Sequence, residues 1–335
     1  MTAPLQRRQC LARLGGLLVA GLGLGGPALA RTDIQRATRA LMGTKVDIVA
    51  QGADTVTMAR AIEAAFAEMQ RLERLMSHYR SDSLVAALHR RAGQGAVDIP
   101  AEMRAVLHRA SALSLLSDGA FDITVGAYDG WSFSDAKARI PSDADLRQAR
   151  RLVDFRDVHL LGHQARLARP GMRIDLGGVA KLPILQAGLQ VLEQHGLRNV
   201  MINGGGDVLT RGQLDGRDWR VGIRDPRQPD RLIGTVHLSE GCVVSSGDYE
   251  RGFVHNGRRY HHVLDPTTGL PTQGVRGVVM VARHPGTVNG LGASIMAAGA
   301  AAGHTLLEAL PEVDGLIVDG RHAIRTTGRM AENLA

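Results

Sequence analysis

One glycine-rich segment of the sequence combines an acid, bare backbone and a lysine in a pattern that suits an anionic ligand. It reads Ile174-Asp175-Leu176-Gly177-Gly178-Val179-Ala180-Lys181, and we expect it to open a helix. Free backbone N–H groups at a helix start bind anions, and Lys181 adds a positive charge one turn further in. The spacing is neither a P-loop nor a G-x-G-x-x-G fingerprint, and a structural turn from strand to helix explains it equally well.

A second segment pairs a proton acceptor with an acid. His261-His262-Val263-Leu264-Asp265 precedes the turn signature Pro266-Thr267-Thr268-Gly269. A histidine can take a proton, and an aspartate three residues later can orient or charge it. Neighbouring side chains of a strand point to opposite faces, so only one histidine can face a given site. We favour His262 for that position, and a solvent-facing pair is the alternative. Upstream, Ser245-Ser246-Gly247-Asp248-Tyr249-Glu250-Arg251 belongs to the same region.

Three further segments are less specific. Residues 117–126 (SDGAFDITVG) place Phe121 among acids and glycines, where bare backbone can approach a planar ring, although a helix end followed by a turn explains them too. Residues 203–207 (NGGGD) indicate either close backbone approach or a tight hairpin. Residues 288–294 (VNGLGAS) predict a helix start with its N-cap at Asn289.

Hydrophobic periodicity indicates which elements position these segments. Apolar residues at three- and four-residue spacing predict helices over 55–76, 101–116 and 178–195, with later helical patterns over 288–298 and 301–310. Alternation predicts one strand over 41–50, interrupted by Gly43. Further β-prone runs are 200–203, 219–223, 234–238, 242–245, 252–254, 275–281 and 315–318. Helices and strands do not alternate strictly, so we predict an α+β fold and not a doubly wound parallel sheet.

The first 30 residues have the form of an export signal. A basic start precedes an apolar stretch that is short for a membrane span, and Ala28-Leu29-Ala30 resembles a signal-peptidase site. Arg7-Arg8-Gln9-Cys10-Leu11 is similar to a twin-arginine signal; an ordinary secretory signal or an uncleaved anchor is the alternative. We therefore expect a signal peptide at 1–30 and one domain over 31–335.

Composition bounds the class of protein. The chain has 335 residues and is 44% hydrophobic, which is enough for a large core and excludes wholesale disorder. Its formal charge of +7 raises the hypothesis of nucleic-acid binding, but removing the three arginines of the signal lowers it to +4. Without a basic run or interleaved aromatics, we expect no nucleic-acid partner. Cys242 would be the only cysteine left, so we expect no internal disulfide and an inert, buried thiol.

Taken in order, these motifs resemble the ApbE family of FAD:protein FMN transferases. The matching pieces are Met42-Gly43-Thr44, Met76-Ser77-His78-Tyr79, GAFD at 119–122, DLGGVAK at 175–181, GGD at 205–207, SSGDYER at 245–251 and HHVLDPTTG at 261–269. Each piece is modest, but the series is specific and covers nearly the whole mature chain. The resemblance implies a single compact α+β domain, related to the T-fold, with a mixed antiparallel sheet packed against helices.

The resemblance also implies a reaction. FAD is the substrate, Mg²⁺ sits at its pyrophosphate, and a Thr or Ser hydroxyl of an acceptor protein attacks the FMN phosphorus while AMP leaves. Such a protein would be periplasmic, or held at the inner membrane if its signal is uncleaved. The acceptor would belong to an exported or membrane redox system, so peripheral association with the membrane through it is possible.

Site residues follow from the resemblance position by position. It assigns flavin binding to Met42, Tyr79, Ala120, Phe121, Asp122, Asp175, Lys181 and Val263. It assigns catalysis to His262, as base or hydroxyl-orienting group, supported by Asp248 and Asp265.

The sequence departs from the family where magnesium should bind. The matching positions are Gly178, Asn289 and Ala293, whereas the family has a ligating Asp and Thr at the last two. Asparagine carries no charge and alanine has no side-chain ligand, although hard cations favour carboxylates. Pro183 also replaces part of the family's Gly-Tyr-Ala-Val-Asp continuation, and we expect it in a first helical turn, where proline is tolerated. These differences leave a non-catalytic FAD-binding protein as the alternative function.

Overall fold

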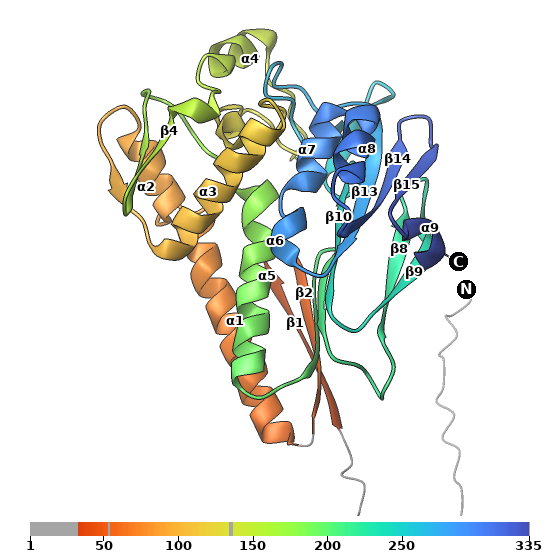
Figure 1. Cartoon of the computed structure of the whole chain (residues 1–335). Coiled ribbons are helices and arrows are strands. Elements are labelled where there is room, and N and C mark those ends of the chain that lie inside the picture. Colours follow the sequence, from red (N-terminus) through yellow and green to blue (C-terminus); the bar gives the residue numbers. More distant parts are fainter. Residues whose placement is uncertain (1–32, 53, 134–136, 335) are drawn as a thin grey trace, which may run out of the picture. The chain divides into compact units, whose positions relative to one another are not determined.

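An eight-stranded antiparallel sheet forms the centre of the structure, a computed structural model that describes residues 33–52, 54–133 and 137–334 (Figure 1). In sheet order its strands are β1 (Asp33–Leu41), β2 (Thr44–Gly52), β6 (Asn199–Gly204), β7 (Asp207–Arg211), β10 (Gly241–Gly247), β13 (Val275–Ala282), β14 (Val313–Asp319) and β15 (Ile324–Thr327). The α+β prediction is therefore confirmed. The signal peptide predicted at 1–30 lies outside the described residues.

Helices cover one face of this sheet (Figure 1). They are α1 (Thr55–Met76), α3 (Ala101–Leu116), α5 (Gly177–Gln194), α7 (Leu291–Ala298) and α8 (Ala300–Glu308). The bounds of α1 and α3 agree with the periodicity, and Asp54 is the N-cap of α1, since its carboxylate accepts a hydrogen bond from Val56 N at 3.0 Å. The apolar stripes of α1 and α5 pack against each other and against the sheet.

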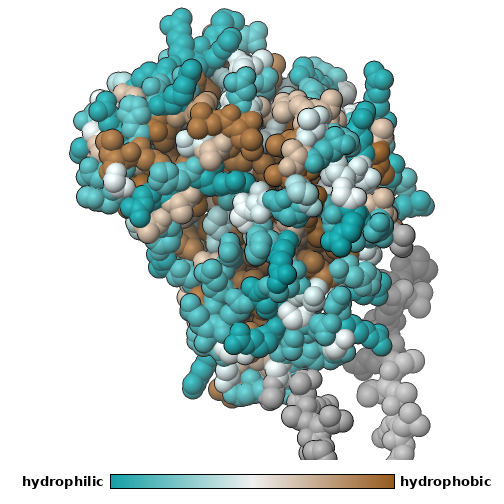
Figure 2. Space-filling view, viewed as in Figure 1, coloured by the Kyte–Doolittle hydropathy of each residue, from teal (hydrophilic) through white to brown (hydrophobic). Residues whose placement is uncertain are grey.

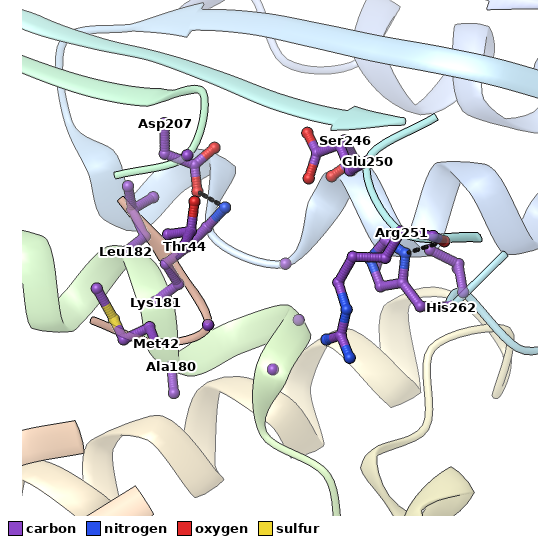
Figure 3. Close-up of a pocket in the computed structure, with 18 of the residues that line it drawn as sticks. Met42, Thr44, Ala180, Lys181, Leu182, Asp207, Ser246, Glu250, Arg251 and His262 are labelled. Atoms are coloured by element: carbon purple, nitrogen blue, oxygen red, sulfur yellow. Dashed lines mark hydrogen bonds and ion pairs between the residues drawn. The ribbon is translucent and has the colours of Figure 1, made fainter. Parts of the chain in front are cut away.

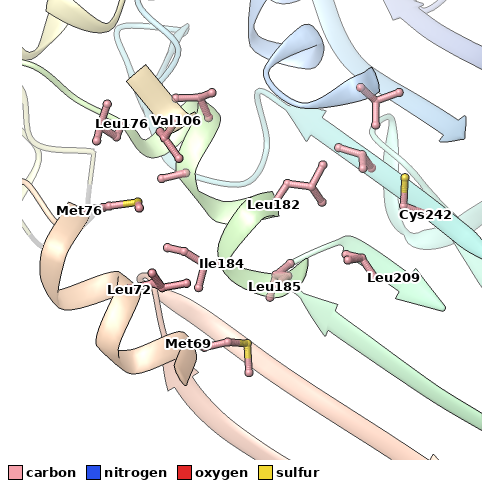
Figure 4. Close-up of a cluster of buried hydrophobic side chains, with 14 of the residues drawn as sticks. Met69, Leu72, Met76, Val106, Leu176, Leu182, Ile184, Leu185, Leu209 and Cys242 are labelled. Carbon is pink, nitrogen blue, oxygen red and sulfur yellow. The ribbon is translucent and has the colours of Figure 1, made fainter. Parts of the chain in front are cut away.

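Fully buried side chains of α1 and α5 build the main core (Figure 4). Met69 and Leu72 from α1 meet Leu185 from α5, and Leu209 and Cys242 come from the sheet below. Cys242 is buried, and burial raises the pKa of its thiol to about 12. The thiol is therefore protonated and unreactive at neutral pH, as predicted.

The opposite face of the sheet is covered by a two-stranded ribbon. β8 (Trp219–Asp225) pairs with β9 (Gln228–Leu238), and short helix α9 (Met330–Asn333) lies beside them. Because side chains alternate along a strand, Val243 points into this second core while Cys242 points into the first.

Two smaller units complete the fold. One is a three-stranded sheet of β3 (Val97–Asp98), β5 (Gln164–Leu167) and β4 (Val158–Leu161), accompanied by α2 (Leu84–Arg91) and α4 (Asp143–Arg150). The other is the hairpin of β11 (Gly252–His255) and β12 (Arg258–His261). The sequence analysis predicted only β11 among these elements.

The visible surface divides by hydropathy (Figure 2). Hydrophilic side chains cover most of the lower half, over α1 and α5, and hydrophobic groups gather in the upper half, around α3. Leu115 and Leu116, at the end of α3, are exposed. In the described ranges, none of the helices combines the length and apolar character needed to cross a bilayer.

Three local predictions were wrong. Residues 41–50 are not one strand: β1 ends at Leu41, Met42 and Gly43 form the turn, and β2 begins at Thr44. The helix predicted over 288–298 is broken, because α6 (Pro285–Val288) ends before α7 starts. Gly290, in the left-handed region at φ 80°, is the N-cap of α7, so Asn289 is not.

Pro183 is a fourth correction, because it lies inside α5 and not in its first turn. A proline has no N–H, so the carbonyl four residues earlier, that of Val179, receives no helical hydrogen bond from it. The Asn289 side chain fills this gap, since its Nδ2 donates to Val179 O at 3.0 Å. Asn289 is 5% exposed, so this bond stabilises a carbonyl that water does not reach freely.

Candidate active site

A cavity of about 1340 Å³ opens beside the first turns of α5 (Figure 3). Its walls come from segments far apart in the sequence: the β1–β2 turn, the α1–α2 connection, residues 120–133, the β6–β7 turn, residues 249–251, residues 262–264 and the α6–α7 junction. All the site residues predicted from the sequence line it, except Asp248 and Asp265. The tertiary fold thus joins the motifs in one place.

The β1–β2 turn at Met42 and Gly43 forms one wall of the cavity, and its backbone is strained. Met42 and Gly43 have φ values of 53° and 72°, as a two-residue hairpin turn of this type requires. Positive φ is unfavourable for methionine. The Met42 N–H donates to Glu73 Oε1 at 2.7 Å, so α1 holds the turn in place. A strained residue fixed at a cavity wall is typical of functional sites.

The start of α5 carries Asp175. Its Oδ1 accepts from Gly177 N at 2.7 Å and lies 2.9 Å from Nδ1 of His78. Burial opposes the charged carboxylate, but the hydrogen bond and charge of His78 outweigh it, and the pKa of Asp175 lies below its ordinary value. Asp175 is therefore ionised at neutral pH and fixed at the helix start.

Lys181 faces two acids across the cavity. Its Nζ lies 3.0 Å from Asp207 Oδ2, which the β6–β7 hairpin positions (Figure 3). Burial works against the ammonium, yet Asp207 and Glu250 raise the pKa of Lys181 above its ordinary value. Burial raises the pKa of Glu250 to about 7 in spite of Lys181. The glycines of 203–207 form the tight hairpin, and Gly205 and Gly206 also line the cavity.

The adjacent histidines point to different places, but not through strand alternation, because β12 ends at His261 and His262 lies in the bend that follows. His261 is buried away from the cavity and its Nε2 donates to Thr272 O at 2.8 Å. His262 lines the cavity, and its Nδ1 lies 3.4 Å from the carbonyl oxygen of Arg251. Because a carbonyl only accepts, Nδ1 carries the proton and Nε2 keeps a free lone pair. Burial and the charge of Arg251 lower the pKa of His262 to about 4, so the ring is neutral at pH 7.

Tyr79 and Arg251 meet across the cavity. Arg251 Nη2 donates to the Tyr79 hydroxyl at 2.8 Å, although the two residues belong to distant segments. Tyr79 is 70% exposed, and besides this contact its ring packs against that of His78, with the ring centroids 3.7 Å apart.

Phe121 and Asp122 lie deeper in the wall. The Phe121 ring packs on Gly178, where an added Cβ would meet its Cε2 at 3.2 Å. Asp122 accepts from Thr124 N at 2.7 Å and from Phe155 N at 2.9 Å. Burial raises the pKa of Asp122 above its ordinary value. These two residues shape the wall, and their side chains are largely satisfied within the protein.

Asp248 and Asp265 lie outside the cavity lining. Asp248 pairs with Arg276 at 3.1 Å and with the more distant Arg259. Asp265 Oδ1 accepts from Thr267 N at 2.7 Å and caps the turn after His262. Asp248 and Asp265 therefore position neighbouring segments of the protein, and neither lies where it could contact a substrate in the cavity.

The three predicted metal positions come together but supply few ligands. An added Cβ on Gly178 would lie 3.6 Å from Ala293 Cβ, so these two positions touch. Ala293 has no oxygen in its side chain, and the Asn289 side chain, which donates through Nδ2 to Val179 O, offers a single uncharged oxygen. In the part of the chain that the structure describes, no three His, Cys, Asp or Glu residues are grouped to hold a metal ion. The residues present do not fit a magnesium site.

Five residues of this site were not assigned a role from the sequence: Glu73, His78, Asp207, Glu250 and Arg251. All but Glu73 lie inside motifs already quoted, so their position was a usable signal. Their roles depend on partners in other segments, which local sequence does not show.

A cavity with a neutral histidine, an ionised carboxylate and cations, on an α+β scaffold, is an enzyme-like site that can hold an anionic ligand and move a proton. The sequence matches the ApbE family over residues 42–317. It is 32% identical over 293 residues to the FAD:protein FMN transferase of Treponema pallidum, covering 82% of this chain and 81% of that protein. It is 30% identical over 235 residues to that of Klebsiella pneumoniae, covering 69% and 72%.

Solved structures agree. The ApbE protein from Thermotoga maritima superposes with a TM-score of 0.82 at 29% identity, covering 90% of this chain and all of that one. Flavin transferase ApbE from Vibrio cholerae gives 0.77 at 25% identity, covering 89% and 97%. The chain belongs to the ApbE family, which confirms the resemblance seen in the motifs.

Proposed function

We propose that this protein is a FAD:protein FMN transferase. The observation that carries the proposal is the convergence of the family's motif residues from distant segments on one cavity. At about 1340 Å³, the cavity exceeds the ~300–1,000 Å³ of ordinary small-molecule sites. That volume suits a dinucleotide together with the hydroxyl-bearing segment of a second protein.

The chemistry assigned to the site is phosphoryl-type transfer. The acceptor oxygen forms a bond to the FMN phosphorus of FAD, the bond from that phosphorus to the bridging oxygen breaks, and AMP leaves with that oxygen. His262 Nε2, neutral and unprotonated, accepts the hydroxyl proton. Tyr79 and Asp175 line the flavin nucleotide site, with Lys181 toward the phosphates.

The acceptor and the compartment are part of the same proposal. We expect a Thr or Ser hydroxyl on an exported or membrane protein of a redox system, reached in the periplasm after export through the signal at 1–30. Magnesium would stabilise charge on the pyrophosphate if it were bound, but no step here is assigned to it.

A second candidate is a FAD-binding protein that does not catalyse transfer. The observation that favours it is the poor donor set at Gly178, Asn289 and Ala293. It predicts tight FAD binding with no AMP release.

The discriminating experiment incubates the purified protein with FAD, a range of Mg²⁺ concentrations and candidate acceptor proteins. We expect the acceptor to gain the mass of FMN while one AMP appears per transfer. FAD binding without transfer at any metal concentration would favour the second candidate.

His262→Ala tests the assigned base, and the adjacent His261→Gln serves as its control. General-base catalysis contributes about 10²–10⁴-fold, and a base with so low a pKa belongs at the lower end, so we expect a loss of about 100-fold. His261→Gln should lower the melting temperature and leave transfer per folded molecule within about threefold, since His261 does not line the cavity. Normal transfer by His262→Ala would remove His262 from the mechanism.

A further inference from the structure

Asn289, at the position where the family has a metal ligand, stabilises helix α5 in this chain. Asn289 donates through Nδ2 to Val179 O, the carbonyl left without a helical partner by Pro183. A carboxylate cannot donate a hydrogen bond, so it could not replace the amide here. Both residues depart from the family pattern, and the structure shows them as a matched pair.

The surroundings of this position also disfavour a cation. Arg109 donates to the carbonyl oxygens of Asn289 at 3.0 Å and Thr287 at 2.9 Å, which places a guanidinium charge directly against the α6–α7 junction. On the cavity side, Ala293 and the Phe121 ring pack on Gly178. A hard divalent cation prefers charged oxygen ligands, and this locus offers an apolar wall and a neighbouring positive charge.

The anionic pyrophosphate must nevertheless meet positive charge. Lys181 is already paired with Asp207 at 3.0 Å, and Arg173 lies 3.3 Å from Asp129. Within the described ranges, four cations that line the cavity have no carboxylate at salt-bridge distance: Lys45, Arg220, Arg224 and Arg251. Of these, Arg251 lies beside His262, and its guanidinium donates to the neutral Tyr79 hydroxyl. That contact is easily exchanged for a doubly charged acceptor, because arginine binds phosphate oxygens through two parallel N–H groups.

Arg251 also lies close to the proposed base, His262. Figure 3 shows its side chain projecting into the cavity beside His262 and toward the α5 helix. Its charge acts on both His262 and Asp175. If His262 takes the proton of the attacking hydroxyl, the phosphorus under attack lies within a few ångströms of His262, and so near Arg251.

We propose that the Arg251 guanidinium supplies the charge that faces the pyrophosphate of FAD, and that a divalent cation at Gly178, Asn289 and Ala293 adds little to FAD binding. The inference rests on FAD being the ligand of the proposed function. It does not depend on whether FMN is then transferred.

The test measures equilibrium affinity for FAD by quenching of flavin fluorescence, with the protein in EDTA or in MgCl₂. For the wild-type protein we expect the two values to agree within about threefold. Arg251→Gln should weaken FAD binding by about tenfold or more, because a charge-assisted bidentate contact is lost. It should change binding of riboflavin, which has no phosphate, by less than about twofold.

Two further variants control for general effects. Arg258→Gln removes the same charge from the exposed first residue of β12, outside the cavity lining, and should leave FAD affinity within about twofold of the wild-type value. Arg251→Lys keeps a charge without the two-pronged geometry and should lie between wild type and Arg251→Gln. It also carries the test if Arg251→Gln does not fold.

The outcomes separate clearly. An increase of about tenfold or more in wild-type FAD affinity on adding Mg²⁺, or FAD binding by Arg251→Gln equal to wild type, would overturn the inference. Absence of FMN transfer with the expected affinities would leave the inference standing and refute the proposed transferase. Absence of any FAD binding would refute both.

Discussion

The hydrogen bond between Asn289 and the carbonyl freed by Pro183 gives a prediction that can be worked out from the structure. The bond joins Nδ2 and Val179 O at 3.0 Å across 110 residues of sequence, and the Asn289 side chain is buried. Removing a partner from a buried hydrogen bond costs about 1–3 kcal/mol, since the remaining group stays unsatisfied. We therefore expect Asn289→Ala to lower the free energy of unfolding by about 2 kcal/mol.

Pro183→Ala restores the missing N–H. In that background Val179 O can accept from the helix itself, so Asn289→Ala should cost only about half as much or less. The four proteins of this cycle are compared by urea denaturation, and we expect a coupling energy of about 1 kcal/mol or more. Asn289→Asp is a more severe version, because it sets a buried carboxylate against a carbonyl oxygen.

The reasoning would be refuted if the effects of Asn289→Ala and Pro183→Ala on the free energy of unfolding were additive. If Asn289→Ala costs the same with Pro183 as with Ala at that position, within about 0.5 kcal/mol, the two residues are independent. If Asn289→Asp is as stable as wild type and gains Mg²⁺ affinity measured by calorimetry, Asn289 remains a metal position and not a structural donor.

Two further predictions concern charged groups beside the cavity. Burial raises the pKa of Glu250 in the folded protein to about 7, whereas its pKa in the unfolded chain is about 4.5, so ionisation of Glu250 destabilises the folded protein as the pH rises above about 4.5. In thermal scans, Glu250→Gln should therefore melt at a higher temperature than wild type at pH 8 and at the same temperature at pH 4. An equal difference at both pH values would contradict this. Asp248→Asn should lower the free energy of unfolding by about 2 kcal/mol, which is less than the cost of breaking a fully buried ion pair, because Arg259 and Arg276 are partly exposed. The rate of FMN transfer should stay within about threefold of the wild-type rate. A loss of transfer beyond tenfold in fully folded protein would return Asp248 to the catalytic group.

Sequence periodicity and turn chemistry determined the local elements of this protein. Helices 55–76 and 101–116 follow directly from apolar spacing, because each buries one stripe against a common core. Strand alternation indicated that only one of His261 and His262 could face the site, and the position of His262 next to the turn favoured it; the structure places His262, and not His261, in the cavity lining. The order of the motifs was sufficient to indicate the family.

Only the tertiary structure decided which side chains act together. It moved Asp265 from a catalytic assignment to a turn cap, brought Arg251 to Tyr79 across the cavity, and matched Asn289 with the carbonyl freed by Pro183. The physical reason is that these contacts join segments with no local relation, so their energies depend on the packing of α5, the sheet and the α6–α7 junction. A pattern of residue types records what a side chain can do, and the fold determines which partner it meets.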